Sequence, residues 1–280
     1  MKKLCVAVIA VLLCAMPRAQ TPPDAFSPQM IKAFADYLFA DGFFDEAESE
    51  YKRYLFSVPQ PDVSAIMPLA ALYNARSDKD GIVWLRKSFY GALTPPMQEK
   101  LTLIHGRIVF SERSADEFVS LYSAVRPELP RFSLDAQQLL ALSDALLSQN
   151  IQTAAAISQA AARTQALFGP VSAECGAYKP KNAKGAVLLS GLVPGLGKWY
   201  GGTFSGFATD FIAVSACAAA TIYTGIQSDW HDWRPYLFGA IGAALYVIDL
   251  YGSYKNVQRY NAAAYRRICE ATDSLYEMLD

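Results

Sequence analysis

The sequence predicts an all-α protein, with a soluble helical-repeat domain followed by a transmembrane helical hairpin. Two observations support this fold class. Residues 21–168 carry apolar side chains at helical spacing among ordinary charged positions, whereas residues 183–252 contain long runs almost free of charge. The composition reflects both parts, because 52% of the 280 residues are hydrophobic and only 18% are charged. We expect a signal peptide at 1–19, a repeat domain at 20–175, a membrane module at 176–261 and a C-terminal helical tail at 262–280.

Residues 1–19 have the pattern of an export signal. Lys2 and Lys3 precede an apolar stretch at 4–16 that is short for a membrane span. A lipidated Cys14 and an uncleaved signal anchor are the two alternatives to a cleaved peptide. In each case the domain that follows is exported.

The soluble domain begins with a helix, a turn and a second helix between Pro28 and Pro59. The turn and the second helix carry Gly42, Phe44, Ala47, Tyr51, Tyr54 and Pro59. These residues resemble the signature of a tetratricopeptide repeat. The resemblance implies that a small residue such as Ala47 lets the two helices approach, and that the proline closes the unit.

Three further helical pairs are expected at 65–93, 98–125 and 134–168, and they match the repeat less well. In the first of them, Trp84 and Leu85 stand near the place where small residues belong. Such units bury their apolar faces only by stacking. The resemblance implies a shared surface that binds a protein or peptide partner; the alternative is that these helices form only a spacer or a degenerate bundle.

Residues 204–226 and 235–253 are long and apolar enough for two membrane spans. The short loop between them holds Trp230 and Trp233, as is typical of a membrane surface. Small residues on both spans allow close packing, and the same faces could join copies of the chain into a homo-oligomer. These residues are Gly202, Gly206, Ala213, Ala216, Ala220, Gly239, Gly242 and Ala243.

A short apolar segment before the spans is interrupted by proline and glycine. Residues 186–193 are too few to cross a bilayer, and aromatic residues follow them. This pattern predicts a broken interfacial or re-entrant helix, with a short third span as the alternative. The membrane motif consists of Pro194, Gly195, Gly197, Lys198, Trp199, Tyr200 and Gly201.

With its flanking features, this motif resembles a bacterial membrane module of uncharacterised biochemical role. The features are Lys179-Pro180-Lys181, the run from Ser190 to Gly202, Tyr251-Gly252-Ser253 and Tyr260-Asn261. Members often carry an export signal and helical repeats ahead of the module. The resemblance implies a location in the bacterial cell envelope and supplies no reaction. Asp249 departs from the pattern, since an asparagine is expected there, and this weakens a proton-relay role.

Two acidic residues interrupt the spans, Asp210 early in the first and Asp249 late in the second. In an antiparallel hairpin these depths coincide, so both acids are expected near Lys198. Because charges at membrane depth are costly, one hypothesis is an ion or proton site. The hypothesis we favour is that both acids lie close enough to the interface to reach water or pair with neighbouring bases.

Cys175 and Cys269 lie just outside the two ends of the hydrophobic module. A hairpin brings these ends to one side of the membrane, where an oxidising periplasm would permit a disulfide. Two free thiols are the alternative.

The sequence offers no motif for catalysis, a cofactor or a metal ion. The run from Gly191 to Lys198 lacks the glycine spacing and the hydroxyl of a phosphate-binding loop. His105 and His231 are far apart and have no metal-ligand spacing. A net charge of −1 without a basic stripe argues against nucleic acid. An active site of dispersed carboxylates is the only enzymatic alternative, and we expect none.

These features predict a non-catalytic, membrane-anchored scaffold or adaptor of the cell envelope, embedded in the lipid bilayer. The alternative is a small transport or lipid-handling component that acts through the Pro194-Gly195 segment, Asp210 and Asp249. Two spans would leave the basic flanks of the module in the periplasm, against the positive-inside preference. Either a third span at 186–200 or the dominance of the exported domain would resolve this conflict.

Overall fold

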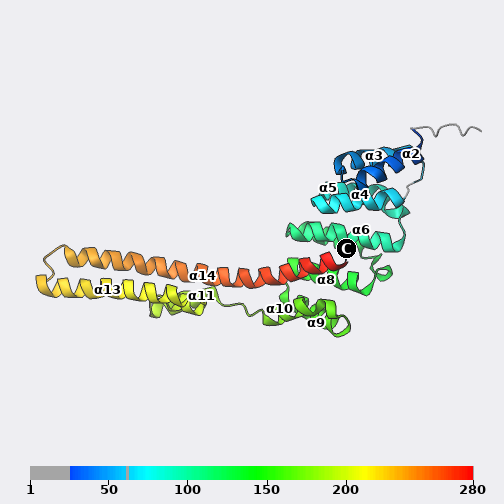
Figure 1. The fold of residues 1–280 in the computed structure, drawn as a ribbon. Helices are drawn as coiled ribbons and strands as arrows, with labels where there is room; N and C mark the ends of the chain where they lie inside the picture. Colours follow the sequence, from blue (N-terminus) through cyan, green and yellow to red (C-terminus); the bar gives the residue numbers. More distant parts are fainter. Residues whose placement is uncertain (1–25, 61–62, 280) are drawn as a thin grey trace, which may run out of the picture. The chain divides into compact units, whose positions relative to one another are not determined.

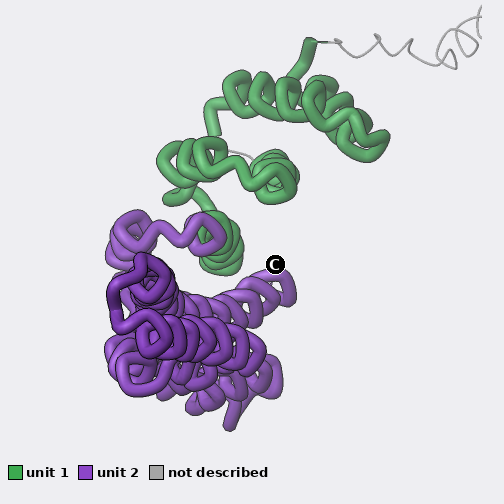
Figure 2. Tube along the Cα trace, turned by 90° about the vertical axis from the view of Figure 1, so that its left-hand side faces the viewer, with its two compact units in different colours: residues 1–108 green, residues 109–280 purple. Residues whose placement is uncertain are grey.

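The computed structural model describes residues 26–60 and 63–279, and all the regular structure in these ranges is helical (Figure 1). The predicted all-α fold class is therefore confirmed. The chain divides into two compact units, Met1–Ile108 and Val109–Asp280, which Figure 2 colours separately. The predicted export signal at 1–19 lies outside the described residues.

The first unit is built from helical pairs. Pro28 occupies the first turn of its opening helix, where its missing N–H costs nothing, and Gly42 turns the chain at a φ of +84°. The buried core lies between successive pairs. The helices of this unit are α2 (Pro28–Ala40), α3 (Phe44–Ser57), α4 (Val63–Arg76), α5 (Lys79–Phe89) and η1 (Tyr90–Ala92), and α6 (Pro95–Ser111) begins in it.

Three residues of the predicted repeat signature pack between α2 and α3 or beside them. Ala47 is fully buried, which lets the two helices approach closely, and Tyr51 and Tyr54 are buried with it. The Tyr51 hydroxyl donates to Oδ1 of Asp36 at 2.8 Å. Burial, and then this hydrogen bond, raise the pKa of Tyr51. Phe44, by contrast, remains exposed at the start of α3.

Gly81 provides the close approach in the second pair. A Cβ atom on Gly81 would lie 2.6 Å from the Tyr73 ring, so α5 packs directly against that ring. Small residues were expected near Trp84 and Leu85. The small residue that permits the close packing is Gly81, about one helical turn earlier. Leu85 is fully buried, and Trp84 packs its ring at 5.5 Å from that of Phe89.

The second unit continues the series of helical pairs. Ser133 and Asn150 cap the first turns of two of its helices by accepting the N–H groups of Ala136 and Thr153. The second helices of the four pairs begin at nearly constant intervals, at Phe44, Lys79, Ala115 and Ile151. The added elements are α7 (Ala115–Val125), η2 (Leu129–Arg131), α8 (Leu134–Leu147), α9 (Ile151–Thr164), η3 (Ala166–Phe168) and α10 (Gly169–Ala177).

The last helix, α14 (Arg234–Leu279), is continuous over 46 residues. Its second half closes the core of the helical domain: Tyr276 is buried with its hydroxyl 2.9 Å from Oγ of Ser143. The Tyr265 hydroxyl donates to the carbonyl of Leu146 at 2.8 Å. The described part of the predicted C-terminal helical tail, residues 262–279, is helical and continues the second apolar helix without a break.

The helices α13 (Phe204–Ser228) and α14 lie side by side and are joined by residues 229–233 (Figure 1). Both are long and apolar enough to cross a membrane, and no part of the apolar window of α13 is buried. A Cβ atom on Gly242 would lie 3.1 Å from that of Cys217, so small residues do bring the two helices close together. The predicted spans fall within these helices.

Candidate functional site

The candidate site is a junction of four helices: α11 (Ala183–Leu192) packs against α14, and the short α12 (Leu196–Tyr200) packs against α11, α13 and α14. Asn182 begins α11 by accepting two N–H groups of its first turn. The helix ends before Pro194, and Gly195 takes a φ of +83°. The segment predicted to break at Pro194 and Gly195 does so.

Gly195 is held from two sides. Its N–H donates to Oδ2 of Asp249 at 2.6 Å. A Cβ atom at this position would lie 2.6 Å from the carbonyl oxygen of Phe207. Both its backbone conformation and its surroundings therefore require glycine.

Asp249 is fully buried and ends a chain of hydrogen bonds. Ser253 donates to its Oδ1 at 3.3 Å, and Oγ of Ser190 lies 2.8 Å from Oγ of Ser253. Ser190 also accepts the N–H of Gly197 at 3.0 Å. Because each hydroxyl has one proton, Ser190 donates to Ser253, and the chain points toward the carboxylate. It joins α11, α12 and α14.

Lys198 completes the cluster. Its Nζ forms an ion pair with Asp210 and lies 3.9 Å from Oδ1 of Asp249. Glycines on two helices leave room for the lysine stem: a Cβ atom would lie 3.1 Å from Cδ at Gly206 and 2.9 Å from Cε at Gly252. The structure thus brings together the two acids and the base that the sequence placed at one depth.

The cluster contains two carboxyl groups for one ammonium group. It therefore carries either an excess negative charge or a proton on one acid. Burying such a group is costly unless hydrogen bonds compensate, and the bonds from Gly195 and Ser253 to Asp249 do so. The arrangement can hold a charge and clamp a turn.

Aromatic side chains lie beside this cluster. Trp199 is half exposed, and its ring centroid lies 5.8 Å from that of Phe204 and 5.5 Å from that of Phe207. At the other end of the helix pair, Trp230 and Trp233 are exposed as well. Aromatic residues thus mark both ends of the apolar surface.

The outlying motif residues are in direct contact. The N–H of Lys181 donates to the Asn261 side chain at 2.9 Å, and that side chain donates back to the Lys181 carbonyl at 2.9 Å. The Lys181 ammonium donates to the carbonyl of Tyr200 at 2.7 Å and lies 4.0 Å from the Tyr260 ring centroid. The residues around Lys181, Tyr200, Tyr260 and Asn261, on which the resemblance rests in part, therefore pack together.

Sequence reasoning missed Asn256, which donates to the carbonyl of Lys198 at 3.0 Å and accepts from Thr203 at 3.1 Å. The sequence does contain a signal for this residue. Asn256 is spaced by three or four residues from Ser253 and Tyr260, and Asp249 precedes them at the same spacing, so these polar groups lie on one face of α14.

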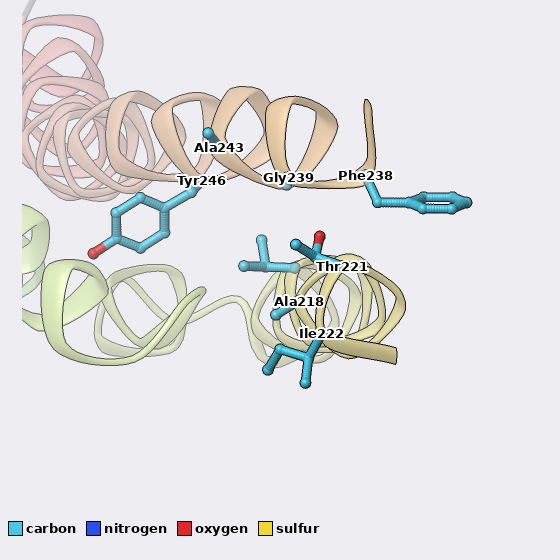
Figure 3. Close-up of a pocket in the computed structure, with 9 residues that line it drawn as sticks. Ala218, Thr221, Ile222, Phe238, Gly239, Ala243 and Tyr246 are labelled. Carbon is cyan, nitrogen blue, oxygen red and sulfur yellow. The ribbon is translucent and has the colours of Figure 1, made fainter. Parts of the chain in front are cut away.

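Shallow hollows lie elsewhere on the described part of the chain, and two of them concern the predicted spans and the predicted repeat. The first, of about 360 Å³, separates α13 from α14 at small residues such as Ala218 and Gly239 (Figure 3). The second, of about 370 Å³, lies between α2 and α3, where Phe34 and Leu38 are bordered by acidic residues including Glu46.

Cys175 on α10 and Cys269 on α14 are both buried, and neither forms a disulfide. Burial raises the pKa of both thiols, and the neighbouring Cys269 adds to the effect at Cys175. The two helices pack together, and the disulfide between them stays a prediction.

Within the described ranges, no group of three or more His, Cys, Asp or Glu residues could hold a metal ion. Comparisons of the chain with protein-family models, with curated proteins and with solved structures give no match.

Proposed function

We propose that this chain is a non-catalytic, membrane-anchored scaffold of the bacterial cell envelope, whose tetratricopeptide-like helices hold a protein or peptide partner. The observation that carries the proposal is the exposed apolar surface of α13 and α14, which includes Ile212, Ile226 and Val247. Exposing so large an apolar surface to water is unfavourable, and a lipid bilayer would remove it from water. The 25 residues of α13 give it a length of about 37 Å, enough for a hydrocarbon core of about 30 Å.

The packing of α14 supports an even number of membrane crossings. Its end at Tyr276 is buried against Ser143 of the helical domain. Since both residues lie on the same side, the intervening chain has to return to the side from which it left. Two crossings, by α13 and α14, fit this condition. Residues 183–200 then form an interfacial or re-entrant element.

We place the helical domain in the periplasm because of the export signal expected at 1–19. The basic flanks of the module then lie in the periplasm too, against the positive-inside preference. A third span cannot resolve this conflict with the positive-inside preference, because three crossings would place Tyr276 and Ser143 on opposite sides of the membrane. Long exported domains cross largely regardless of charge, and this removes the conflict.

The surface that we assign to the partner is the hollow between α2 and α3. Phe34 is 51% exposed there, and the exposed carboxylate of Glu46 borders it, whereas the bordering Asp45 and Glu50 form ion pairs with arginines of the chain. Such a surface favours a segment that offers an apolar side chain with a lysine or arginine beside it.

Site-specific photo-crosslinking in cells tests this assignment. A benzoylphenylalanine at Phe34 should give one reproducible adduct with a second protein. The same group at Val119, which is also exposed on a helix, is the control. Equal adducts at both positions, or none at Phe34 despite normal abundance, would count against the partner surface. The full chain is needed, because an excised domain ending at 175 would lack the buried Tyr276.

A second candidate function rests on the cluster of Lys198, Asp210 and Asp249. Its surplus carboxyl group favours the transport or lipid-handling alternative. That alternative predicts that Asp210→Asn abolishes function while abundance and melting temperature stay unchanged. The scaffold proposal predicts that the same change lowers the melting temperature, because the ion pair with Lys198 holds α12 against α13.

A further inference from the structure

We propose that the face of α14 bearing Tyr251, Lys255 and Arg259 binds the headgroup of an anionic phospholipid. The inference rests on the proposed membrane location of α13 and α14. Lys255 and Arg259 are exposed, one helical turn apart. Neither forms an ion pair with an acidic residue in the part of the chain that the structure describes. Their charges are free to meet an external anion.

These side chains border a shallow surface pocket of about 410 Å³. Gln258 and Tyr251 line it together with the two cations, and the Lys255 ammonium lies 5.7 Å from the Tyr251 ring centroid. An ammonium, a guanidinium and an amide are donors that suit the oxygens of a phosphodiester.

The same face of α14 becomes apolar toward the helix pair. Val247 and Ile248 stand one turn before Tyr251, and both are more than 60% exposed. Along one face the side chains are therefore apolar, then aromatic, then cationic. This order matches a phospholipid from its acyl chains to its phosphate, whereas a free phosphate would use only the cationic part.

The level of this pocket also matches a membrane interface. Asn256, next to Lys255, donates to the carbonyl of Lys198, and Trp199 follows directly in α12. Tryptophan is enriched at headgroup depth. The two free cations thus lie at about the same level along α14 as the aromatic residues that mark one end of the apolar surface.

The experiment is a titration of the detergent-purified full chain with dioleoyl phosphatidylglycerol or dioleoyl phosphatidylcholine, followed by native mass spectrometry. We expect the chain to bind the anionic lipid more tightly. In Lys255→Gln/Arg259→Gln, affinity for phosphatidylglycerol should fall by about thirtyfold, since each cation near an anionic surface contributes about fivefold. Affinity for phosphatidylcholine should stay unchanged.

Two variants control for charge and for folding. Lys87→Gln/Arg163→Gln removes the same charge from exposed helix positions elsewhere and should bind like the wild type. Lys255→Arg/Arg259→Lys keeps both charges and should also retain the preference. Glutamine favours helix about as well as lysine and arginine do, so α14 should keep its structure.

The inference is overturned if the wild type shows no preference, if the double variant retains it, or if the control pair loses it equally. Displacement of the lipid by excess inorganic phosphate would also overturn it, by showing a simple anion site. Flotation with phosphatidylcholine vesicles separates this result from the proposed function. A chain that does not float overturns both, whereas one that floats without lipid preference overturns only the headgroup site.

Discussion

The backbone N–H of Gly195 donates to Oδ2 of Asp249 across 2.6 Å, and this bond ties the turn between α11 and α12 to the middle of α14. The acceptor is fully buried, and the donor stands in a conformation that favours glycine. The motif around Gly195 therefore has a structural explanation before any chemical one.

A matched pair of glycine substitutions tests this explanation. Gly195→Ala should lower stability by more than about 2 kcal/mol, because the left-handed conformation alone costs about 1–2 kcal/mol and the new Cβ would meet Phe207. Gly191→Ala places the same methyl group in helix α11, with its nearest neighbour at 3.9 Å, and should be neutral or slightly stabilising. Thermal unfolding in detergent, followed by tryptophan fluorescence, measures both. Equal melting temperatures for the two variants would contradict the explanation.

The ion pair of Lys198 with Asp210 gives the second prediction. Lys198→Met and Asp210→Asn should each lower the melting temperature, since each leaves part of the cluster unpaired. The double variant should be more stable than the sum of the single effects predicts, with a coupling of about 1–3 kcal/mol. Arg131→Met with Glu128→Gln is the control, because that exposed pair should show almost no coupling. Additive effects at Lys198 and Asp210 would refute the pairing.

The sequence predicted much of this cluster because its residues are unusual for their surroundings. Proline followed by glycine breaks an apolar helix, and a carboxylate in an apolar run needs a partner. The contacts of Asn256 and Gly252 were not predicted, since asparagine and glycine on a long helix are ordinary until the facing helix is known. Gly81 was not predicted for the same reason, because its importance depends on its close contact with Tyr73 on the neighbouring helix.

The continuity of α14 was not predicted either, and it leads to the third prediction. The sequence becomes more polar after Ser253, and for this reason the end of the predicted span was placed there. No proline or glycine, however, interrupts the helix from Ser253 to Leu279. Tyr276→Ala should destabilise the helical domain by about 3–5 kcal/mol, as truncation of a buried aromatic residue does. Met278→Ala, at a side chain that is 64% exposed, should change little. Limited proteolysis of residues 134–177 measures the effect, and equal protection in the two variants would argue against this packing.

The two buried thiols give the fourth prediction. Since burial raises the pKa of Cys175 and Cys269, less thiolate is present at pH 8 and alkylation by iodoacetamide should be slow. A cysteine introduced at exposed Ser274 on the same helix should react much faster, as mass spectrometry of the labelled peptides would show. Equally rapid reaction of Cys269 would refute its burial. Reaction at Cys175 and Cys269 only after reduction and unfolding would establish the disulfide.

Labelling of single cysteines with a membrane-impermeant maleimide in intact cells and in lysed cells tests the proposed membrane anchor most directly. Three exposed positions suffice: Gln152 in the helical domain, His231 between α13 and α14, and Glu277 near the end of α14. The predicted result is that Gln152→Cys and Glu277→Cys label from the periplasm, while His231→Cys labels only after lysis. Labelling of all three positions from one side, or of Gln152→Cys and Glu277→Cys from opposite sides, would contradict a two-span membrane scaffold.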